Sequence, residues 1–321
     1  MKNCFLGACV ALTALPWSVL AQPAYPSRPI TMVVPFVAGG GTDSIARDIA
    51  KSMTDRLGQP VVIDNRGGAG GAIGADIVAK ARPDGYTLLF ATSTFATNAA
   101  VEPKLPYDPQ RSFAPVAMIG RGPLLVVASP QLGAKNIAEV IAAAQSRPHG
   151  LNFCSAGNGS INHLSGEMFR QKTRSNMTHI PFKGSGPATV ELLSGRVDLF
   201  FTTVPTILPF LRDGKVQALA VTSAKRSPLF PTVPTLTEAG VAGFDITTWW
   251  GVLAPGGTPP AIIDALNRAI NDAAAAEPVK GRLVHEGADP VHTTPAAFGI
   301  ELGKELALWR KVASNPTMQL R

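Results

Sequence analysis

Short apolar segments with the composition of buried β-strands alternate along this chain with glycine-rich turns and amphipathic helices. In the first half we expect strands at residues 30–36, 60–63 and 86–90, and helices at 45–57 and 75–81. Gly58 ends the first of these helices, whose apolar residues recur at helical spacing: Ile45, Ile49, Met53 and Leu57. Strands that are separated by helices in this way predict parallel sheets with helices on both faces.

The second half of the chain repeats this order of elements without a sequence repeat. Strands are expected at 151–154, 179–182, 197–201 and 216–221, with helices at 164–171 and 188–193. Between the halves, residues 116–129 are apolar at both ends around a central Gly-Arg-Gly-Pro. This pattern predicts one strand that leaves the first sheet and enters the second. We interpret residues 249–254 as a second crossing, which returns the chain to the first domain.

The end of the chain predicts two helices that complete the first domain. Thr258 offers a capping hydroxyl ahead of Pro259 and Pro260, and proline suits the first turn of a helix. The apolar stripes of the two helices are Ile262, Leu266, Ile270 and Ala273, and Phe298, Leu302, Leu306, Trp309 and Ala313. The sequence therefore predicts two doubly wound α/β lobes, residues 22–122 plus 251–321 and residues 123–250. A two-strand hinge would join them, with a ligand cleft between.

The N-terminus has the layout of a secretory signal peptide. Lys2 precedes an apolar run, and Val19-Leu20-Ala21 fits the cleavage site, so we expect residues 1–21 to be removed. Pro16 interrupts the run, which is shorter than the roughly 20 apolar residues that a membrane-spanning helix needs. We therefore expect a soluble protein outside the cytoplasm.

Charge and cysteine content narrow the classes of function. Without Lys2 the chain has 28 Lys and Arg against 22 Asp and Glu, a net charge of +6. The basic residues are scattered and form no concentrated stripe, which excludes nucleic acid as a partner and favours a surface that attracts anions mildly. Cys4 and Cys9 lie in the expected signal peptide, which leaves Cys154 without a partner for an internal disulfide.

Three of the expected strands end in glycine-rich turns that lead into helices. These turns are residues 36–43, 155–160 and 183–187. The start of a helix presents unpaired backbone N–H groups and the positive end of the helix dipole, which together favour an anion. Glycine also lets a ligand approach the backbone closely. Any one of these turns is better explained by the ordinary shape of a strand-to-helix turn, but three at equivalent strand ends in two lobes favour an anion site.

The motifs of enzymes and metal sites are missing from the sequence. Residues 67–74 are rich in glycine, but Ile73 stands where a dinucleotide-binding loop requires glycine. No phosphate-loop lysine pattern and no glycine-flanked serine nucleophile occurs, and the histidines have no metal-ligand spacing. We interpret Cys154 as a small core residue, and His163 as either a packed histidine or a ligand contact. We therefore expect no catalysis, no cofactor and no metal.

Short motifs in a fixed order run along almost the whole mature chain. They are YPSRPI at 25–30, VPFVAGGGTD at 34–43, LGQPVVIDNR at 57–66, PDGYTL at 83–88, LPYDP at 105–109, SAGNGSINHL at 155–164, PFKGSGPA at 181–188, LSGRVD at 193–198, ALAVTSAKRS at 218–227 and LAPGGTP at 253–259. Together these motifs resemble the Bug family, the substrate-binding proteins of tripartite tricarboxylate transporters. The resemblance implies an α/β fold like that of type II periplasmic binding proteins, whose lobes close around a small carboxylate.

In that family the carboxylate is held by backbone amides and ordered water rather than by an arginine clamp. The resemblance carries ligand-binding roles to Phe36, Val37, Gly40, Thr42, Asp43, Thr92, Ser93, Thr94, Asn98, Ser155, Asn158, His163, Gly184 and Asp198. Asp198 either accepts from a ligand amine or hydroxyl or caps the local backbone. We favour the second role, because an uncompensated like charge would weaken anion binding.

This sequence departs from the family pattern at positions that bear on the distal part of a ligand. Phe182 stands where tyrosine is common, and Thr202-Thr203 replaces an Asp-Asn type of pair. The proximal carboxylate site is intact, whereas the distal group of the ligand is left open among di- and tricarboxylates, hydroxy acids, amino acids and aromatic acids.

The resemblance implies a periplasmic solute-binding protein that captures a small carboxylate for membrane permease subunits of a tripartite tricarboxylate transporter. One alternative is a ligand-dependent receptor that reports to a membrane sensor without transport, and a second is an exported hydrolase. Genes for permease subunits nearby would favour transport, and catalytic turnover would favour the hydrolase. We expect a monomer with no nucleic-acid partner.

The cleavage motif generates the first prediction, which is that the mature protein begins at Gln22. The small side chains of Val19 and Ala21 fit the specificity of signal peptidase at these positions. Mass spectrometry of intact protein from the periplasmic fraction should give the mass of the chain from Gln22 onward. A periplasmic protein that retains residues 1–21 would contradict the prediction.

Overall fold

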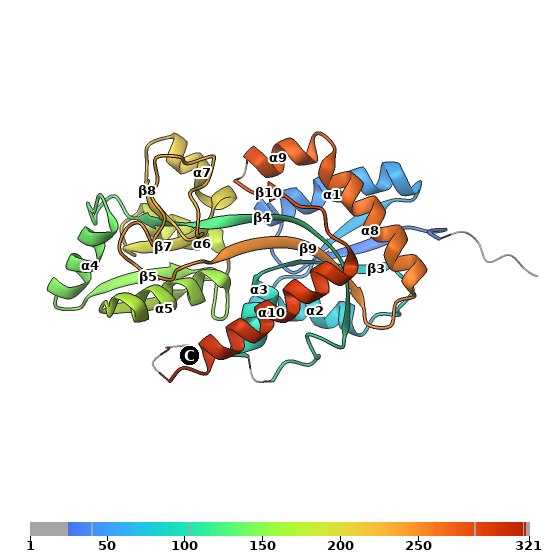
Figure 1. Ribbon diagram of the computed structural model, residues 1–321, viewed down its shortest axis with the longest axis horizontal. Helices are drawn as coiled ribbons and strands as arrows, with labels where there is room; N and C mark the ends of the chain where they lie inside the picture. The colour runs from blue at the N-terminus through green and yellow to red at the C-terminus, as the bar shows by residue number, and fades with distance from the viewer. Residues whose placement is uncertain (1–24, 40, 103, 286, 317, 319–321) are drawn as a thin grey trace, which may run out of the picture.

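The computed structural model describes residues 25–39, 41–102, 104–285, 287–316 and 318. The predicted signal peptide, residues 1–21, and Gly40 of the predicted ligand site lie outside the described residues. Figure 1 shows helices packed around two groups of strands, with β4 (Phe113–Ala128) and β9 (Thr247–Pro255) running between the groups. The fold is mixed α/β, as the alternation of strands and helices predicted.

The sheet of the first lobe is built on β1 (Ile30–Val34). This strand pairs in parallel with β2 (Val61–Asn65) on one side and with β3 (Thr87–Thr92) on the other. β9 pairs antiparallel with β3, β4 pairs antiparallel with β9, and the short β10 (Asp289–Pro290) pairs with β4.

Helices cover both faces of this sheet. Apolar residues of α1 (Gly41–Leu57), α8 (Pro260–Ala275) and α9 (Val279–His285) form the core on one face. Those of α2 (Ala72–Ala79), α3 (Thr94–Val101) and α10 (Pro295–Ala313) form the core on the other, and the short 3-10 helix η1 (Ala69–Gly71) precedes α2.

The second lobe has the same plan. β5 (Leu151–Ser155) pairs in parallel with β6 (Met177–Pro181) and β7 (Leu199–Thr203), and β4 pairs antiparallel with β7 and β8 (Gln217–Val221). α4 (Ile137–Ser146) and α5 (Ile161–Thr173) join the core that continues into the first lobe beneath α10. α6 (Ser185–Leu193) and α7 (Val204–Arg212) enclose a separate core on the opposite face.

Two strands connect the lobes, and both crossings predicted from the sequence are confirmed. Within β4, residues 113–123 pair with β9, whereas residues 124–128 pair with β7 and β8. β9 begins beside the second sheet, where the Ile246 N–H donates to the carbonyl of Thr222, and ends in the first, where Leu253 lies opposite Leu89. The lobes are therefore joined by an antiparallel pair of strands.

Four helices, α3, α4, α7 and α9, lie where the apolar spacing predicted none. Asn136 caps α4, because its side-chain oxygen accepts from the backbone N–H of Glu139 at 2.9 Å. In α7, Pro205 occupies the first turn and Pro209 lies inside the helix, where its missing N–H removes a helix bond. Burial of Ile207 and Leu208 in the core of the second lobe outweighs that local preference.

The predicted capping role of Thr258 is wrong. α8 begins at Pro260, and the Thr258 hydroxyl donates to the carbonyl of Pro255 at 2.8 Å instead. The reason is the residue order, because a residue that precedes proline is excluded from the helical region. Pro259 is therefore held extended, with φ −56° and ψ 139°, and the helix starts one residue too late for Thr258 to cap it.

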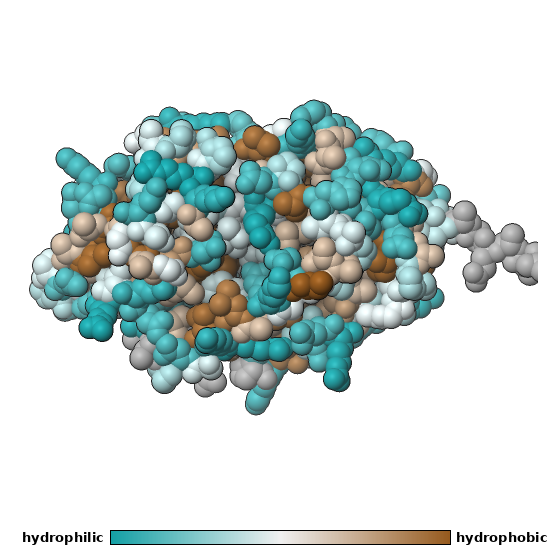
Figure 2. All heavy atoms as spheres, viewed as in Figure 1, coloured by the Kyte–Doolittle hydropathy of each residue, from teal (hydrophilic) through white to brown (hydrophobic). Residues whose placement is uncertain are grey.

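The surface is polar over both lobes. Figure 2 shows hydrophilic side chains across this face, with the hydrophobic residues in separate patches. Within the part of the chain that the structure describes, no helix combines the length and the apolar character that a membrane crossing requires.

A glycine on β9 is required by its packing, which generates a stability prediction. A Cβ at Gly251 would lie 2.8 Å from the Phe298 ring and 2.9 Å from the Ala117 carbonyl oxygen, which is backbone and cannot move aside. Gly251→Ala should therefore lower the free energy of unfolding by about 1–3 kcal/mol. Urea unfolding followed by circular dichroism measures the change.

The matched control lies on α10. A Cβ at Gly303 would meet nothing within 4 Å, so Gly303→Ala should raise the free energy of unfolding by about 0.5–1 kcal/mol. Equal effects of the two alanines would contradict the packing argument.

Candidate functional site

The ends of the strands in the two lobes face each other, and glycines let the loops there approach closely. We call this place the junction; it includes Gly41 and Gly70 of the first lobe and Asn158 and Pro205 of the second. A Cβ at Gly41, at the start of α1, would collide with Pro205 at the start of α7. On the other side of the junction, a Cβ at Gly70 would lie 3.1 Å from the Asn98 side chain and 3.3 Å from the carbonyl oxygen of Asn158. The loops that the sequence singled out in both lobes therefore meet at one place.

The first of these loops, residues 36–43, is shaped by a buried carboxylate. Asp43 accepts from the Gly39 N–H at 2.9 Å, from Arg47 Nε at 2.9 Å and from Asn65 Nδ2 at 2.9 Å. Burial opposes the charge of this carboxyl, but these hydrogen bonds outweigh burial and hold the pKa of Asp43 below its usual range. Because its oxygens already have donors within the first lobe, Asp43 organises the loop.

The other predicted residues of this loop differ in exposure. Phe36 is half-buried, and its carbonyl accepts from Asn65 Nδ2 at 3.2 Å. Thr42 is half-buried in the first turn of α1, whereas Val37 is 65% exposed, an exposure that suits a residue that contacts a ligand rather than the core.

Thr92, the last residue of β3, and three predicted residues that follow the strand are all buried. The Thr94 N–H donates to Thr92 Oγ1 at 3.3 Å, and the Trp249 N–H donates to Ser93 Oγ at 2.9 Å. Asn98 Nδ2 donates to the carbonyl of Ala69 at 3.1 Å, which fixes the glycine-rich turn before α2. Ser93 is thus bonded to a crossing strand, while Asn98 lies at the junction, where a Cβ at Gly159 of the second lobe would meet its side chain.

In the second lobe the site is built around two stacked histidines. The rings of His163 on α5 and His179 on β6 lie 3.7 Å apart between centroids at an angle of 12°. His179 Nε2 is 2.6 Å from Ser155 Oγ, and the Gly159 N–H donates to His163 Nδ1 at 3.2 Å. Burial, with a smaller contribution from His163, lowers the pKa of His179 to about 3, so this ring is neutral at ordinary pH.

Two further predicted residues lie on loops beside this pair. Asn158 is exposed on the turn that faces the first lobe. Gly184 precedes α6 with φ 110°, a conformation that favours glycine, and a Cβ there would meet nothing within 4 Å. Space therefore remains beside the first turn of α6 for a group that accepts from its N–H groups.

Asp198 is not brought to this junction. It precedes β7, at the end of the strand away from the loops, where its carboxylate accepts from the Asn152 N–H at 2.7 Å and pairs with Arg147 at 3.2 Å. Its observed contacts are those of the backbone cap that the sequence analysis favoured, so we withdraw its ligand-binding role.

His179 is the functional candidate that the sequence analysis missed. Its position on a short strand gave no signal by itself, because the stack with His163 depends on the pairing of Phe153 with His179 between β5 and β6.

Cys154 is a buried core residue, as the sequence analysis expected, and burial raises the pKa of its thiol. Within the described residues no cluster of His, Cys, Asp or Glu could hold a metal ion.

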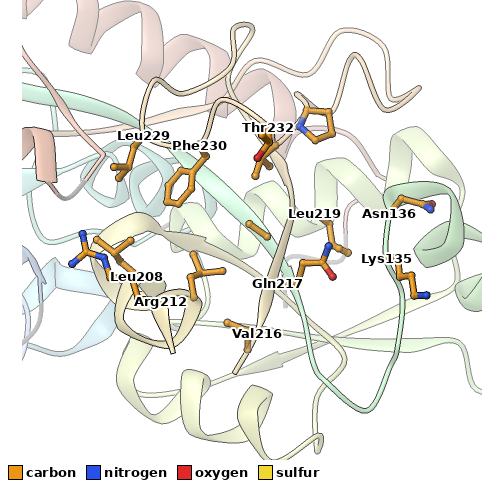
Figure 3. Close-up of a pocket in the computed structure, with 14 residues that line it drawn as sticks. Lys135, Asn136, Leu208, Arg212, Val216, Gln217, Leu219, Leu229, Phe230 and Thr232 are labelled. Carbon is orange, nitrogen blue, oxygen red and sulfur yellow. The ribbon is translucent and has the colours of Figure 1, made fainter. Parts of the chain in front are cut away.

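An open cavity of about 660 Å³ lies elsewhere on the second lobe (Figure 3). It lies between α7, β8 and the loop at 229–234, and its lining includes Lys135, Leu208, Gln217, Phe230 and Thr232. A smaller cavity of about 300 Å³ lies beside Arg121. Neither contains a predicted ligand residue. Helix starts from the two lobes meet at the junction instead, and we propose the ligand site there.

Comparison with known proteins decides the family. Residues 45–298 match the model of the tripartite tricarboxylate transporter family receptor. The chain belongs to this receptor family. It is 40% identical over 318 residues to the protein BugT of Bordetella pertussis, a match that covers 98% of this chain and 97% of the relative.

Solved structures agree with this assignment. A Rhodopseudomonas palustris protein described as MatC with bound malate superposes with a TM-score of 0.85 at 37% identity, over 90% of this chain and 100% of that chain. R. palustris Rpa4515 with adipate gives a TM-score of 0.86 at 39% identity, over 90% of this chain and 97% of that chain. Receptors of this family are periplasmic solute-binding proteins rather than enzymes, and the predicted family and periplasmic-binding-protein fold are confirmed.

The neutral histidine generates a prediction about pH and stability. A histidine whose pKa falls on folding stabilises the fold fully above its unfolded value near 6.5, and this contribution is lost as the pH falls toward its folded value of about 3. Lowering the pH from 6.5 to 4.5 should therefore reduce the free energy of unfolding by about 1–2 kcal/mol. His179→Phe, which keeps a flat ring beside His163, should remove that part of the acid destabilisation.

Urea unfolding at several pH values measures the difference between the two proteins. His149→Phe is the matched control, because this histidine is exposed on the surface of the same lobe. The prediction is wrong if His179→Phe and the unaltered protein lose stability in parallel.

Proposed function

We propose that this receptor captures a small carboxylate between its lobes and delivers it to the membrane permease subunits of a tripartite tricarboxylate transporter. The observation that carries the proposal is the meeting of helix starts from both lobes at one junction. Malate and adipate in the structures of related proteins support a dicarboxylate as the ligand class. The family name supports permease subunits as the partner, and we propose that the receptor works as a monomer.

The proposed site joins both lobes. From the first lobe it takes Phe36, Val37, Gly40, Thr42, Thr92, Thr94 and Asn98, with Asp43 and Ser93 fixing the loops. From the second it takes Ser155, Asn158, His163 and Gly184. We propose lobe boundaries at 22–122 plus 251–321 and at 123–250, because β4 changes sheet between residues 123 and 124 and β9 enters the first sheet near residue 250.

Recognition in this proposal depends on dipoles rather than on a salt bridge. Hydrogen bonds to a charged group contribute roughly 1.5–3 kcal/mol each, and a helix terminus adds up to ~2 kcal/mol when it is partly buried. Two or three such bonds with lobe closure are enough for micromolar affinity, about −8 kcal/mol. Lys183, the cation closest in sequence to Gly184, is exposed and should contribute little.

A thermal-shift screen of the mature protein against mono-, di- and tricarboxylates, followed by calorimetry, tests the proposal. We expect at least one dicarboxylate to bind with micromolar affinity and its dimethyl ester, which lacks the charge, not to bind. Thr94→Val keeps the shape of the side chain but removes its hydroxyl, so it should weaken binding about 10- to 100-fold.

Lys183→Ala is the matched control and should weaken binding less than about threefold. Binding that survives esterification, or that is lost in Lys183→Ala and kept in Thr94→Val, would overturn recognition by dipoles. A carboxylate panel without any hit would overturn the ligand class.

A further inference from the structure

The C-terminal helix α10 contacts both crossing strands at the same level. Arg121 on β4 and Trp249 on β9 lie opposite each other in the register of the two strands. Arg121 is 3.5 Å from the carboxylate of Glu301, and the Trp249 indole N–H donates to the carboxylate of Glu305. Glu301 is 42% exposed, so its ion pair contributes little, and the main attachment is through Glu305.

Donors from three elements converge on Glu305. Besides Trp249 on β9, the indole N–H of Trp309 on α10 donates to it at 3.2 Å, and the hydroxyl of Ser93 ahead of α3 is a further donor. The ring of Trp249 also packs edge-on against Phe298 of α10, with 5.3 Å between ring centroids. Trp249 therefore has a fixed orientation, set by two side chains of α10.

Ser93 connects this hydrogen-bond network to the loop at 92–94, which belongs to the proposed ligand site. Its Oγ accepts from the backbone N–H of Trp249 at 2.9 Å, and its own N–H donates to the carbonyl of Trp249 at 3.3 Å. Ser93 also stands between Thr92 and Thr94, two hydroxyl residues of the proposed ligand site. A shift of this loop that keeps all its hydrogen bonds must move β9 with it.

We propose that Glu305 is a positioning residue that couples the loop at 92–94 to the crossing strands, so that occupation of the site and the relative position of the lobes change together. The proposal rests on the proposed function, because it takes Thr92 and Thr94 as ligand contacts. Glu305 itself does not touch the ligand. It holds Ser93 and Trp249 in the one arrangement in which the loop and the hinge share hydrogen bonds.

The charge of Glu305 determines how firmly it holds Ser93 and Trp249. An ionised carboxylate accepts from Ser93, Trp249 and Trp309 together, whereas a protonated one brings its own O–H into a place where only donors converge. Burial raises the pKa of Glu305 to about 7, although the three donors and the charge of Arg121 oppose the rise.

The groups that face Glu305 come from every element packed around it. They are Ser93 ahead of α3, Arg121 on β4, Trp249 on β9, and Glu301 and Trp309 on α10. Glu301 is paired with Lys304 at 3.1 Å as well as with Arg121. Glu305 is therefore the buried titratable carboxyl of this cluster, and coupling should strengthen as the pH rises through about 7.

Hydrogen exchange of the ligand-free protein, read by mass spectrometry, tests the coupling without a ligand. In Glu305→Gln, peptides that cover residues 90–96 and those that cover 118–124 and 247–252 should all exchange faster, by about fivefold or more. Glu301→Gln, the same change on the same helix at an exposed position, is the matched control and should leave all three segments unchanged. Faster exchange confined to α10, or in the strands without the loop, would overturn the proposal.

The unaltered protein provides a second measurement that needs no variant. Its tryptophan fluorescence and the exchange of the same segments should change together between pH 6 and 8, and adipate or malate should bind about fivefold more tightly at pH 8 than at pH 6. Because amide exchange is itself base-catalysed, the exchange of each segment is expressed relative to that of an unstructured peptide at the same pH, and a ratio that is independent of pH would overturn the coupling. If this ratio changes with pH but neither dicarboxylate binds at either pH, the coupling stands and the choice of dicarboxylate in the proposed function fails.

The free energy of unfolding should fall over the pH range in which the coupling strengthens. A carboxyl whose pKa rises on folding stabilises the fold below its unfolded value, and this contribution is lost as the pH rises through about 7. The unfolding free energy of the unaltered protein, compared with that of Glu305→Gln, should therefore fall between pH 5 and 8. A purely structural carboxyl would alter stability without altering adipate affinity or its dependence on pH.

Discussion

The antiparallel ladder between β4 and β9 is the constraint on which the other features depend. Its pairs run from Phe113 opposite Pro255 to Pro123 opposite Thr247, with irregularities between residues 115 and 117 and between 118 and 120, so the strands stay paired along the region that joins the lobes. Sliding one strand along the other would break many of these bonds, whereas bending or twisting the pair keeps them. The lobes can therefore rotate relative to each other but cannot shear apart. At Gly122 a Cβ would lie 2.6 Å from the Gly287 carbonyl oxygen, so glycine here lets β4 pack closely against the backbone at Gly287.

Around the junction, charge is neutralised within each lobe before any ligand arrives. Asp43 is satisfied by Arg47, Asn65 and a backbone N–H, and His179, stacked on His163, is placed where burial favours a neutral ring. In the proposed site an anion meets oriented dipoles that need little rearrangement. Selectivity then depends on where hydroxyls and N–H groups lie, which suits a receptor that must release its ligand.

Elements with a local sequence pattern were predicted correctly, whereas features that depend on contacts between segments far apart in the chain were not. Apolar runs on both sides of a central Gly-Arg-Gly-Pro identified β4, and helical spacing identified α10. α7 was missed because Pro205 and Pro209 argue against a helix that only the core of the second lobe explains. Two roles for Asp198 remained open until strand register placed it beside Asn152. The partners of Glu305 belong to three separate segments, and no spacing along the chain brings them together.

The single cysteine among the described residues, Cys154, has a practical consequence. It lies fully buried on β5 against α6, and burial keeps its thiol protonated and unreactive. A reagent that attacks thiolates from solution would therefore leave Cys154 unmarked. A pair of cysteines introduced on the exposed faces of the two lobes could carry spectroscopic labels without removal of any natural residue. The receptor is thus suited to direct distance measurements between its lobes while it opens and closes.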